Sequence, residues 1–405
     1  MNLILYAIPF FFLLMLLEFI YGVLRKRNTY RINDTINSLS LGSLSRLQGL
    51  VVLGFSGLIY EFIVARYQLT QLADDQLWVW LSCFVLYDLA YYWKHRYGHE
   101  IALFWGSHVA HHQSEDYNLS TALRQTSIDF YGFLFYLPFF VLGYPAEILF
   151  TVVSMNLIYQ FWVHTEHVPK LGILEWVFVT PSNHRVHHAR NKIYVDRNYG
   201  GVFILWDRLF GSFQDELESE VAVFGLRKPL NSWNPVWANV HVYWRLLLDC
   251  VKAPSIANKI KICFKPPGWL PDSMQSSCKL RQQETDLSSR FDPALSNFEK
   301  AYCCVQFLIT VGLSLTVIVN INGWSYVATS IAVIYLTYCY YVHGRWLESR
   351  SNAVSLEGIR LILLLGAMPF IDFGDMLQGT LMAFAAASLI VLLISAKRKP
   401  IDAVI

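Results

Sequence analysis

Histidines gathered in four short groups are the residues of this sequence most able to do chemistry. The chain holds 12 histidines, and ten of them fall in these groups. The groups are HxxxH at His95 and His99, HxxHH at His108, His111 and His112, HTEH at His164 and His167, and HxxHH at His184, His187 and His188. Side chains at i, i+3 and i+4 share one face of a helix. Each group can therefore aim two or three imidazoles at one point.

This density of imidazoles predicts bound metal. Imidazole is a preferred ligand of zinc, iron, copper and nickel. Zinc takes four ligands, three of them from the protein in catalytic sites, so the grouped histidines are too many for one such ion. They suit two metals of about five or six ligands each, with positions left open for oxygen and substrate, which is typical of non-haem iron. Carboxylates are expected to fix the tautomer of each ring, and those nearby in sequence are Asp88, Glu100, Glu115, Asp116 and Glu166.

Other residues carry weaker signals of function. His241 and His343 stand alone in the sequence, which favours packing over metal binding. Whether His167 is a ligand stays open, because Val168-Pro169 would break a helix directly after it. Gly200-Gly201 predicts a turn, and Asp207-Arg208 predicts a structural ion pair.

The composition identifies the elements that must position the histidines as membrane helices. Of 405 residues, 55% are hydrophobic and 15% charged, against about 25% charged in soluble domains. The 32 basic and 30 acidic residues nearly balance, which argues against nucleic-acid binding. The 7 cysteines are an odd number without paired spacing, which argues against a disulfide scaffold. We therefore expect an integral membrane protein.

Nine apolar segments approach the ~20 residues that a helix needs to cross a bilayer, so the expected fold is all-α and polytopic. The segments are Leu3–Leu24, Leu39–Val64, Leu77–Trp93, Ile128–Leu142, Ala146–Val163, Tyr302–Val319, Tyr326–Val342, Leu356–Phe370 and Met376–Ser395. The basic run Arg25–Arg27 follows the first segment, and this places the end of that segment in the cytoplasm by the positive-inside rule. Counting nine spans then puts every histidine group near the cytoplasmic face.

These segments divide the chain into four expected regions. Residues 1–75 form N-terminal spans, 76–250 the histidine-bearing domain, 251–298 a cytoplasmic linker and 299–405 a region of four spans. The chain from His164 to about Phe298 is more polar and is expected to form a helical cap on the cytoplasmic side of a histidine-lined two-metal site. The membrane is expected to be a bacterial inner membrane or the endoplasmic reticulum.

The order HxxxH, HxxHH, HxxHH resembles the fatty acid hydroxylase and sterol desaturase superfamily of membrane di-iron enzymes. Within that superfamily the sequence most resembles the alkylglycerol monooxygenases. The stretches that carry the resemblance are HRYGHEIALFWGSHVAHHQSEDYNLSTALRQ, YQFWVHTE, TPSNHRVHHARN and DRNYGGVFILWDRLFGSF. With the arrangement of spans, they cover roughly residues 80 to 230.

The resemblance implies both a ligand set and a reaction. The implied iron ligands are His95, His99, His108, His111, His112, His184, His187 and His188, with His164 as a further histidine near the metals. Glu100 matches a glutamate tied to activity in these enzymes, through the pterin cofactor. The implied reaction uses oxygen and tetrahydrobiopterin to hydroxylate the ether-linked carbon of an alkylglycerol, and the product then separates into a fatty aldehyde and glycerol. The partners would be a membrane ether lipid, oxygen and a pterin or other electron donor.

Two alternatives remain at this point. The chain could be another lipid hydroxylase or a sterol oxidase or desaturase of the same superfamily, which would release a stable oxidised lipid. It could also be a metal or proton transporter whose histidines form a translocation path. A transporter predicts histidines along the spans at mid-membrane depth, whereas here they stand in tight groups at the ends of spans.

Overall fold

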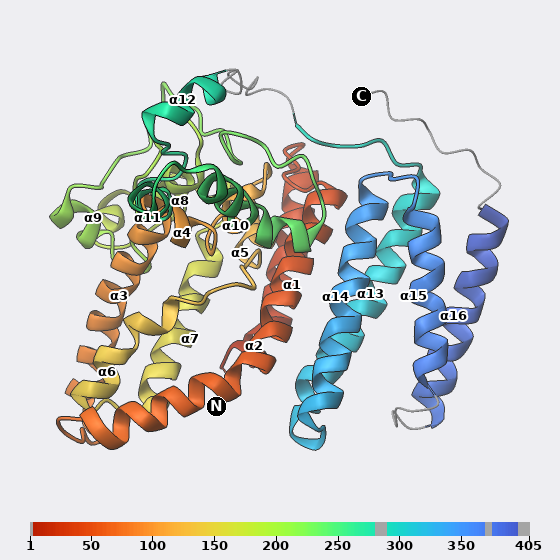
Figure 1. The fold of residues 1–405 in the computed structure, drawn as a ribbon, viewed down its shortest axis with the longest axis horizontal. Helices are drawn as coiled ribbons and strands as arrows, with labels where there is room; N and C mark the ends of the chain where they lie inside the picture. The colour runs from red at the N-terminus through yellow and green to blue at the C-terminus, as the bar shows by residue number, and fades with distance from the viewer. Residues whose placement is uncertain (1–2, 280–289, 369–374, 396–405) are drawn as a thin grey trace. The chain divides into compact units, whose positions relative to one another are not determined.

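The computed structural model describes residues 3–279, 290–368 and 375–395, and its regular elements are helices (Figure 1). Within these residues, β structure is limited to two isolated bridges, Phe178 with Phe203 and Ala189 with Phe224. The all-α class predicted from the sequence is confirmed. Residues 280–289, which belong to the linker expected over residues 251–298, lie outside the described residues.

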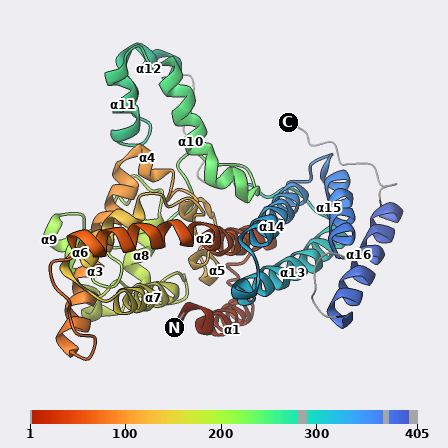
Figure 2. The same ribbon diagram turned by 60° about the horizontal axis from the view of Figure 1, so that its bottom comes forward.

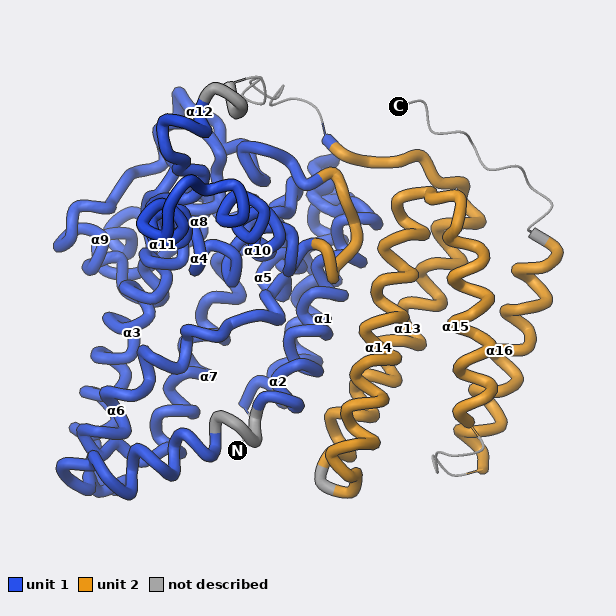
Figure 3. The backbone as a smooth tube through the Cα atoms, in the orientation of Figure 1, with its two compact units in different colours: residues 1–230, 238–290 blue, residues 231–237, 291–405 orange. Residues whose placement is uncertain are grey.

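The chain divides into two compact units (Figure 3). Unit 1 comprises residues 1–230 and 238–290, and unit 2 comprises residues 231–237 and 291–405. All four histidine groups fall in unit 1, whereas the isolated His343 falls in unit 2. The division into four regions with boundaries after residues 75, 250 and 298 stays a prediction.

Long helices form the body of unit 1, and most of its shorter helices gather at one end of them (Figure 1). The long helices are α1 (Leu3–Leu24), α2 (Ile32–Tyr67), α3 (Leu77–Glu100) and α7 (Ala146–Trp162). The other helices are α4 (Ala102–Trp105), α5 (Leu119–Ala122), α6 (Leu137–Leu142), α8 (Pro181–His188), α9 (Leu205–Phe210), α10 (Pro235–Lys252), α11 (Ile256–Phe264) and α12 (Asp272–Lys279). The 3₁₀ turns are η1 (His111–Gln113), η2 (Gly132–Phe135) and η3 (Gly172–Trp176). The turned view shows α10, α11 and α12 extending from the α4 side of the unit (Figure 2).

Apolar contacts between the long helices hold the body of unit 1 together. α3, α6 and α7 share a core that includes Tyr87, Phe140 and Leu149. α1 joins α7 through the stacked rings of Phe11 and Phe161, whose centroids are 4.1 Å apart. The ends of α3 and α7, where histidines stand, are thereby fixed relative to each other.

Several helices have the length and composition of membrane spans. In the described residues, Tyr6–Leu24, Asn297–Val319 and Asp375–Ile394 are long and apolar enough to cross a bilayer, and the bent pair Ile32–Val52 and Gly57–Tyr67 of α2 could make a fourth span. The protein is a multi-pass integral membrane protein. Nine crossings stay a prediction.

The segment expected to span at Ile128–Leu142 is not one continuous helix. Its apolar helical part covers Gly132–Leu142, which at 1.5 Å per residue reaches roughly half of the ~30 Å hydrocarbon core. Asp129 lies just before this helical part, and its carboxylate accepts a hydrogen bond from Gly132 N at 3.0 Å and from Lys94 Nζ at 2.6 Å. The other expected spans each fall on one helix, although Phe370 at the end of one lies outside the described residues.

Unit 2 is a set of helices that pack in succession along the chain. They are α13 (Asn297–Val319), α14 (Tyr326–Leu347), α15 (Ala353–Ala367) and α16 (Asp375–Ser395), with the 3₁₀ turn η4 (Ile321–Gly323) after α13. The buried Arg360 donates to Glu357 from Nε and Nη2, both at 2.7 Å, and Tyr302 of α13 also donates to Glu357 at 2.8 Å. This polar cluster ties α15 to α13, since a buried charge is stable only with its partners.

Candidate metal centre

Four segments of unit 1 bring nine histidines to one place. They are the end of α3 (His95, His99), the loop into η1 (His108, His111, His112), the residue after the C-cap of α7 (His164), and α8 (His184, His187, His188). α8 begins where it does because Thr180 caps it with its side chain, and because Pro181 suits the first helical position.

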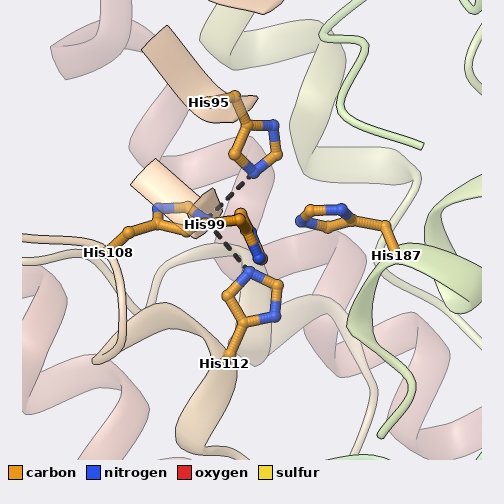
Figure 4. A group of neighbouring side chains, drawn as sticks. All are labelled: His95, His99, His108, His112 and His187. Carbon is orange, nitrogen blue, oxygen red and sulfur yellow. Dashed lines mark hydrogen bonds between the residues drawn. The ribbon is translucent and has the colours of Figure 1, made fainter. Parts of the chain in front are cut away.

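The nine rings form two groups. The first group is His95, His99, His108, His112 and His187, and the second group is His111, His164, His184 and His188. Within each group, one ring nitrogen of every histidine lies within 4.8 Å of all the others. Figure 4 shows the first group, with the rings of the other four arranged around His99. Each group has the atoms and the spacing to hold a metal ion.

Each HxxHH motif serves both groups. His108 and His112 belong to the first group while His111 belongs to the second; His184 and His188 belong to the second while His187 belongs to the first. Histidines four residues apart stay together, and the histidine at i+3 points to the other group. Each motif therefore aims two imidazoles, and not three, at one point, and it links the two sites covalently.

Backbone carbonyls set the tautomer of four rings. In each of these histidines, Nδ1 lies at hydrogen-bond distance from a carbonyl oxygen, which can only accept, so Nδ1 carries the hydrogen. In a neutral ring this leaves a lone pair on Nε2, directed into the group. The pairs are His95 with Tyr199 O (2.8 Å), His111 with Arg124 O (2.9 Å), His164 with Gln160 O (2.8 Å) and His187 with Arg197 O (3.0 Å).

Several Nε2 atoms that point into the groups have no hydrogen-bond donor facing them. Nε2 of His111 and Nε2 of His164 are 3.3 Å apart, and both Nδ1 atoms already hold the ring hydrogen. Two facing lone pairs repel each other, whereas a cation bound by both removes the repulsion. In the first group, Nε2 of His99 and Nε2 of His187 are buried without a hydrogen-bond partner. These orphaned acceptors fit a metal in each group, and an all-imidazole donor set suits iron and its neighbours in the transition series.

Burial keeps the rings neutral, as metal ligation requires. Loss of solvation, with a further contribution from neighbouring imidazoles, lowers the pKa of His187 and His188 well below the usual range of histidine. Burial lowers the pKa of His111 to about 4. All three rings therefore offer lone pairs at neutral pH.

One loop supports three rings of the first group. In the segment Asp196–Tyr199, Arg197 O accepts from His187 and Tyr199 O accepts from His95. Asp196 places a carboxylate oxygen 3.6 Å from Nδ1 of His99. The loop turns sharply, since both Asp196 and Asn198 have positive φ (58° and 56°). A displacement of this loop would therefore disturb three ligand positions together.

Two buried aspartates pin the chain that follows this loop. Asp207 accepts from Tyr199 N and Gly200 N, both at 2.7 Å. Asp88 of α3 accepts from Val202 N at 2.8 Å. The residue before Val202 must be glycine for this close approach, because a Cβ on Gly201 would lie 2.8 Å from Asp88 Oδ1. Gly200-Gly201 is thus a close packing point as well as a turn.

The loop that carries His108, His111 and His112 is held by Arg124. Its Nε donates to Ala110 O at 2.7 Å, one Nη donates to Gln113 Oε1 at 3.2 Å, and its own carbonyl accepts from His111. Sequence reasoning missed Arg124, because a lone arginine in a polar stretch resembles any surface charge.

Glu18 of α1 is a second residue that sequence reasoning missed. It is buried and accepts from Leu119 N at 2.8 Å, and its carboxylate also binds Tyr30 and Thr165. Thr165 directly follows His164, so Glu18 ties α1 to the second group. The signal was present, since an ionisable residue inside an apolar span points to a specific role.

Several expectations for the surroundings of the site were wrong. The carboxylates expected to hold the rings have other partners: Asp116 pairs with Arg31 at 2.8 Å and Glu166 with Arg27 at 3.6 Å. Asp207 does not form the expected pair with its neighbour; it accepts from backbone amides, while Arg208 donates to the Glu175 carbonyl. A backbone carbonyl can accept from a ring N–H in place of a carboxylate, and its position leaves no trace in residue type.

Two further candidates lie outside both groups. Glu100, the last residue of α3, has a partly exposed side chain that accepts from Arg96 Nε at 2.9 Å. His167 contacts Tyr21 of α1, with ring centroids 5.2 Å apart.

Comparison with known proteins agrees with this geometry. The profile of the fatty acid hydroxylase family matches residues 80–212. The alkylglycerol monooxygenase of Homo sapiens is 36% identical over 362 residues, covering 89% of this chain and 81% of the human protein. The chain belongs to the fatty acid hydroxylase family. The resemblance drawn from the histidine motifs is thereby confirmed.

Other members of this family show how far the similarity extends. The alkylglycerol monooxygenases of Danio rerio and Xenopus tropicalis are 36% and 35% identical, each over 89% of this chain and 80% of the relative. No solved structure matches the chain. The protein is a membrane hydroxylase of this family, and its buried histidine groups are typical of a metal site there.

We expect Asp207→Asn to weaken metal binding in the first group by about 10- to 100-fold, the range seen when the groups behind metal ligands are removed. Tyr199 N donates to one carboxylate oxygen of Asp207 and Gly200 N to the other. An amide has a single oxygen, so one of these N–H groups would face its NH2 group, and the Tyr199 carbonyl would shift away from His95. Metal titration measures the affinity, with wild-type and variant protein purified to the same folded fraction. The control is Asp215→Asn, which removes an exposed ion pair with Lys170, and metal affinity equal in the two variants would contradict the role given to Asp207.

Proposed function

We propose that the protein is a di-iron monooxygenase that cleaves the ether bond of alkylglycerols by hydroxylating the ether-linked carbon. The observation that carries the proposal is the pair of buried histidine groups, five and four in number, with their Nε2 atoms directed inward. One iron would be held by His95, His99, His108, His112 and His187, and the other by His111, His164, His184 and His188. Five ligands exceed the four that zinc takes, which favours iron.

The side chains around the irons have definable tasks in this proposal. Iron at the two groups would supply the activation of oxygen needed to oxidise an unactivated C–H bond. Burial lowers the pKa of His111, His187 and His188, so these rings donate lone pairs at neutral pH and do not act as acids. The same burial excludes bulk water, which protects a reactive oxidant from side reactions.

The choice of substrate rests on the relatives. Relatives named alkylglycerol monooxygenases match across 89% of this chain. One oxygen atom would enter the C–H bond beside the ether oxygen, and the other would leave as water with two electrons and two protons from the reductant. The resulting hemiacetal would separate into a fatty aldehyde and a glycerol derivative. We propose tetrahydrobiopterin as the reductant.

The position of that bond in a membrane fits the proposed topology. The ether-linked carbon of a lipid lies just below its headgroup, at the level where membrane helices end. We propose that the histidine groups face the cytoplasmic side, because Arg25–Arg27 follow the first span. A soluble reductant could then approach from the cytoplasm while the lipid enters from the bilayer.

Turnover of defined lipids tests the substrate. The purified protein in nanodiscs, supplied with tetrahydrobiopterin and oxygen, should release a fatty aldehyde from an alkylglycerol, and an ester-linked analogue of equal chain length should release none. Mass spectrometry follows both products. A stable hydroxylated lipid without aldehyde would instead support another lipid hydroxylase of the family and would contradict ether cleavage.

Loss of one histidine from either group should abolish turnover. His187→Ala removes a ligand from the first group and His111→Ala removes one from the second, so both variants should bind less iron. The matched control is His167→Ala, which removes a histidine outside both groups and should retain iron and activity. Wild-type activity in His111→Ala or His187→Ala would exclude that residue from the ligand set.

Glu100 should act on turnover and not on iron binding. We propose that its carboxylate, exposed at the end of α3 and next to His99, contacts the pterin. Glu100→Ala should keep its iron content and lose most activity, measured as iron per chain and as aldehyde release across tetrahydrobiopterin concentrations. Loss of iron in this variant would instead make Glu100 part of the support of the metal site.

A further inference from the structure

The hairpin of α10 and α11 packs against the segment that leads into the metal centre. Tyr243 of α10 bonds Ser107 through its hydroxyl, and a Cβ on Gly106 would lie 2.6 Å from its ring. At the end of α11, Lys265 O accepts from Ala102 N at 3.0 Å. The hairpin thus holds residues 102–107, which lead directly into His108.

The opposite face of the hairpin is apolar and exposed. On α10 the exposed side chains follow the period of a helix, and on α11 they recur every four residues. They are Trp244, Leu247, Leu248 and Val251 on α10, and Ile256, Ile260 and Phe264 on α11. Val251 is 70% exposed and Ile256 is 76% exposed. We call this set the apolar strip.

Positive charge borders the apolar strip. From Tyr243 to Lys265 the chain has five basic residues and one acidic residue, Asp249, which pairs with Arg245 at 3.0 Å. The remaining basic residues are Lys252, Lys259, Lys261 and Lys265; all four are exposed, and among the described residues none forms an ion pair. At 100° per residue, Lys259 and Lys261 lie on either side of the line through Ile256, Ile260 and Phe264.

We propose that the α10–α11 hairpin lies in the membrane surface, with the apolar strip among the lipid chains and the lysines on anionic headgroups. An amphipathic helix with an apolar face between lysines is the form that binds a bilayer interface. Each lysine near an anionic leaflet adds to that binding. An anionic lipid surface offers both an apolar interior for the strip and negative headgroups for the lysines, so it matches both features of the hairpin.

The place of the hairpin in unit 1 fits headgroup depth. α11 packs on α4, which begins at Ala102 directly after α3. The apolar part of α3 ends at Trp93, and nine residues of helix cover about 14 Å, roughly from the edge of the hydrocarbon into the interface. Neither α10 nor α11 is among the described helices that are long and apolar enough to cross the bilayer.

This surface contact has a consequence for the metal centre. Because the inner face of the hairpin holds residues 102–107, its outer face would fix the depth of His108 and its neighbours relative to the lipid. The inference does not depend on which lipid is oxidised, and it would stand if ether cleavage were disproved.

Photocrosslinking of the full-length protein in nanodiscs tests the proposal. p-Benzoylphenylalanine placed at Leu248 or at Ile260 should form lipid adducts, seen by mass spectrometry, at several times the yield of the same probe at Val221. Val221 is a suitable control because it is 79% exposed and apolar but lies outside the hairpin. The adduct yield should rise when phosphatidylserine replaces part of the phosphatidylcholine.

The lysines are tested in the same assay. In the double variant Lys259→Gln, Lys261→Gln, phosphatidylserine should raise the adduct yield less than in wild type, by about fivefold for each lysine removed. The elution volume and iron content should stay unchanged. Adduct yields no higher than at Val221, or adducts mainly with a second protein chain, would overturn the membrane contact. Equal yields in neutral and anionic discs would overturn the role of the headgroups.

Discussion

Nine imidazoles directed at two points are the constraint on which the rest of unit 1 depends. A buried polar group is stable only with a partner, and every imidazole has two nitrogens to satisfy. Carbonyl oxygens accept from Nδ1 in His95, His111, His164 and His187. The Nε2 atoms are left facing one another, which is unfavourable until cations bind them. The arrangement is therefore built for metal and is under internal repulsion without it.

The use of carbonyls as acceptors places a demand on the backbone. A carbonyl oxygen can only accept, so it fixes the ring tautomer with the hydrogen on Nδ1. It holds the ring in place only if the chain that carries it cannot move. Buried charges meet this demand: Asp207 holds the amides of Tyr199 and Gly200, Asp88 holds the next turn, and Arg124 holds the loop that bears His111. Polar residues concentrate around the metal centre for this reason, although the protein as a whole is apolar.

The sequence was sufficient for the class of the fold, because apolar runs are a property of residue type. The spacing and the family resemblance together singled out the nine histidines that the structure brings into two groups, and their role as iron ligands stays a prediction. The sequence was insufficient to predict how each HxxHH motif divides its histidines between the two groups. His111, at i+3 from His108, faces away from His108 and His112. Its neighbours include His184 and His188 of α8, some 70 residues later in the chain. The sequence also could not predict which carbonyls accept from the Nδ1 atoms, since a backbone carbonyl is present at every residue. The segment at residues 128–142 is helical only from Gly132, after Asp129 accepts from the Gly132 amide, and whether it crosses the membrane stays a prediction.

The metal content of the full-length protein, purified in mild detergent and shown to be folded, tests the account most directly. Elemental analysis by mass spectrometry gives metal per chain, and iron reconstitution of the purified protein covers replacement of iron by another metal during expression. The account predicts about two irons per chain, one for each histidine group. One metal ion per chain at saturation, or folded protein that binds no iron, would contradict it.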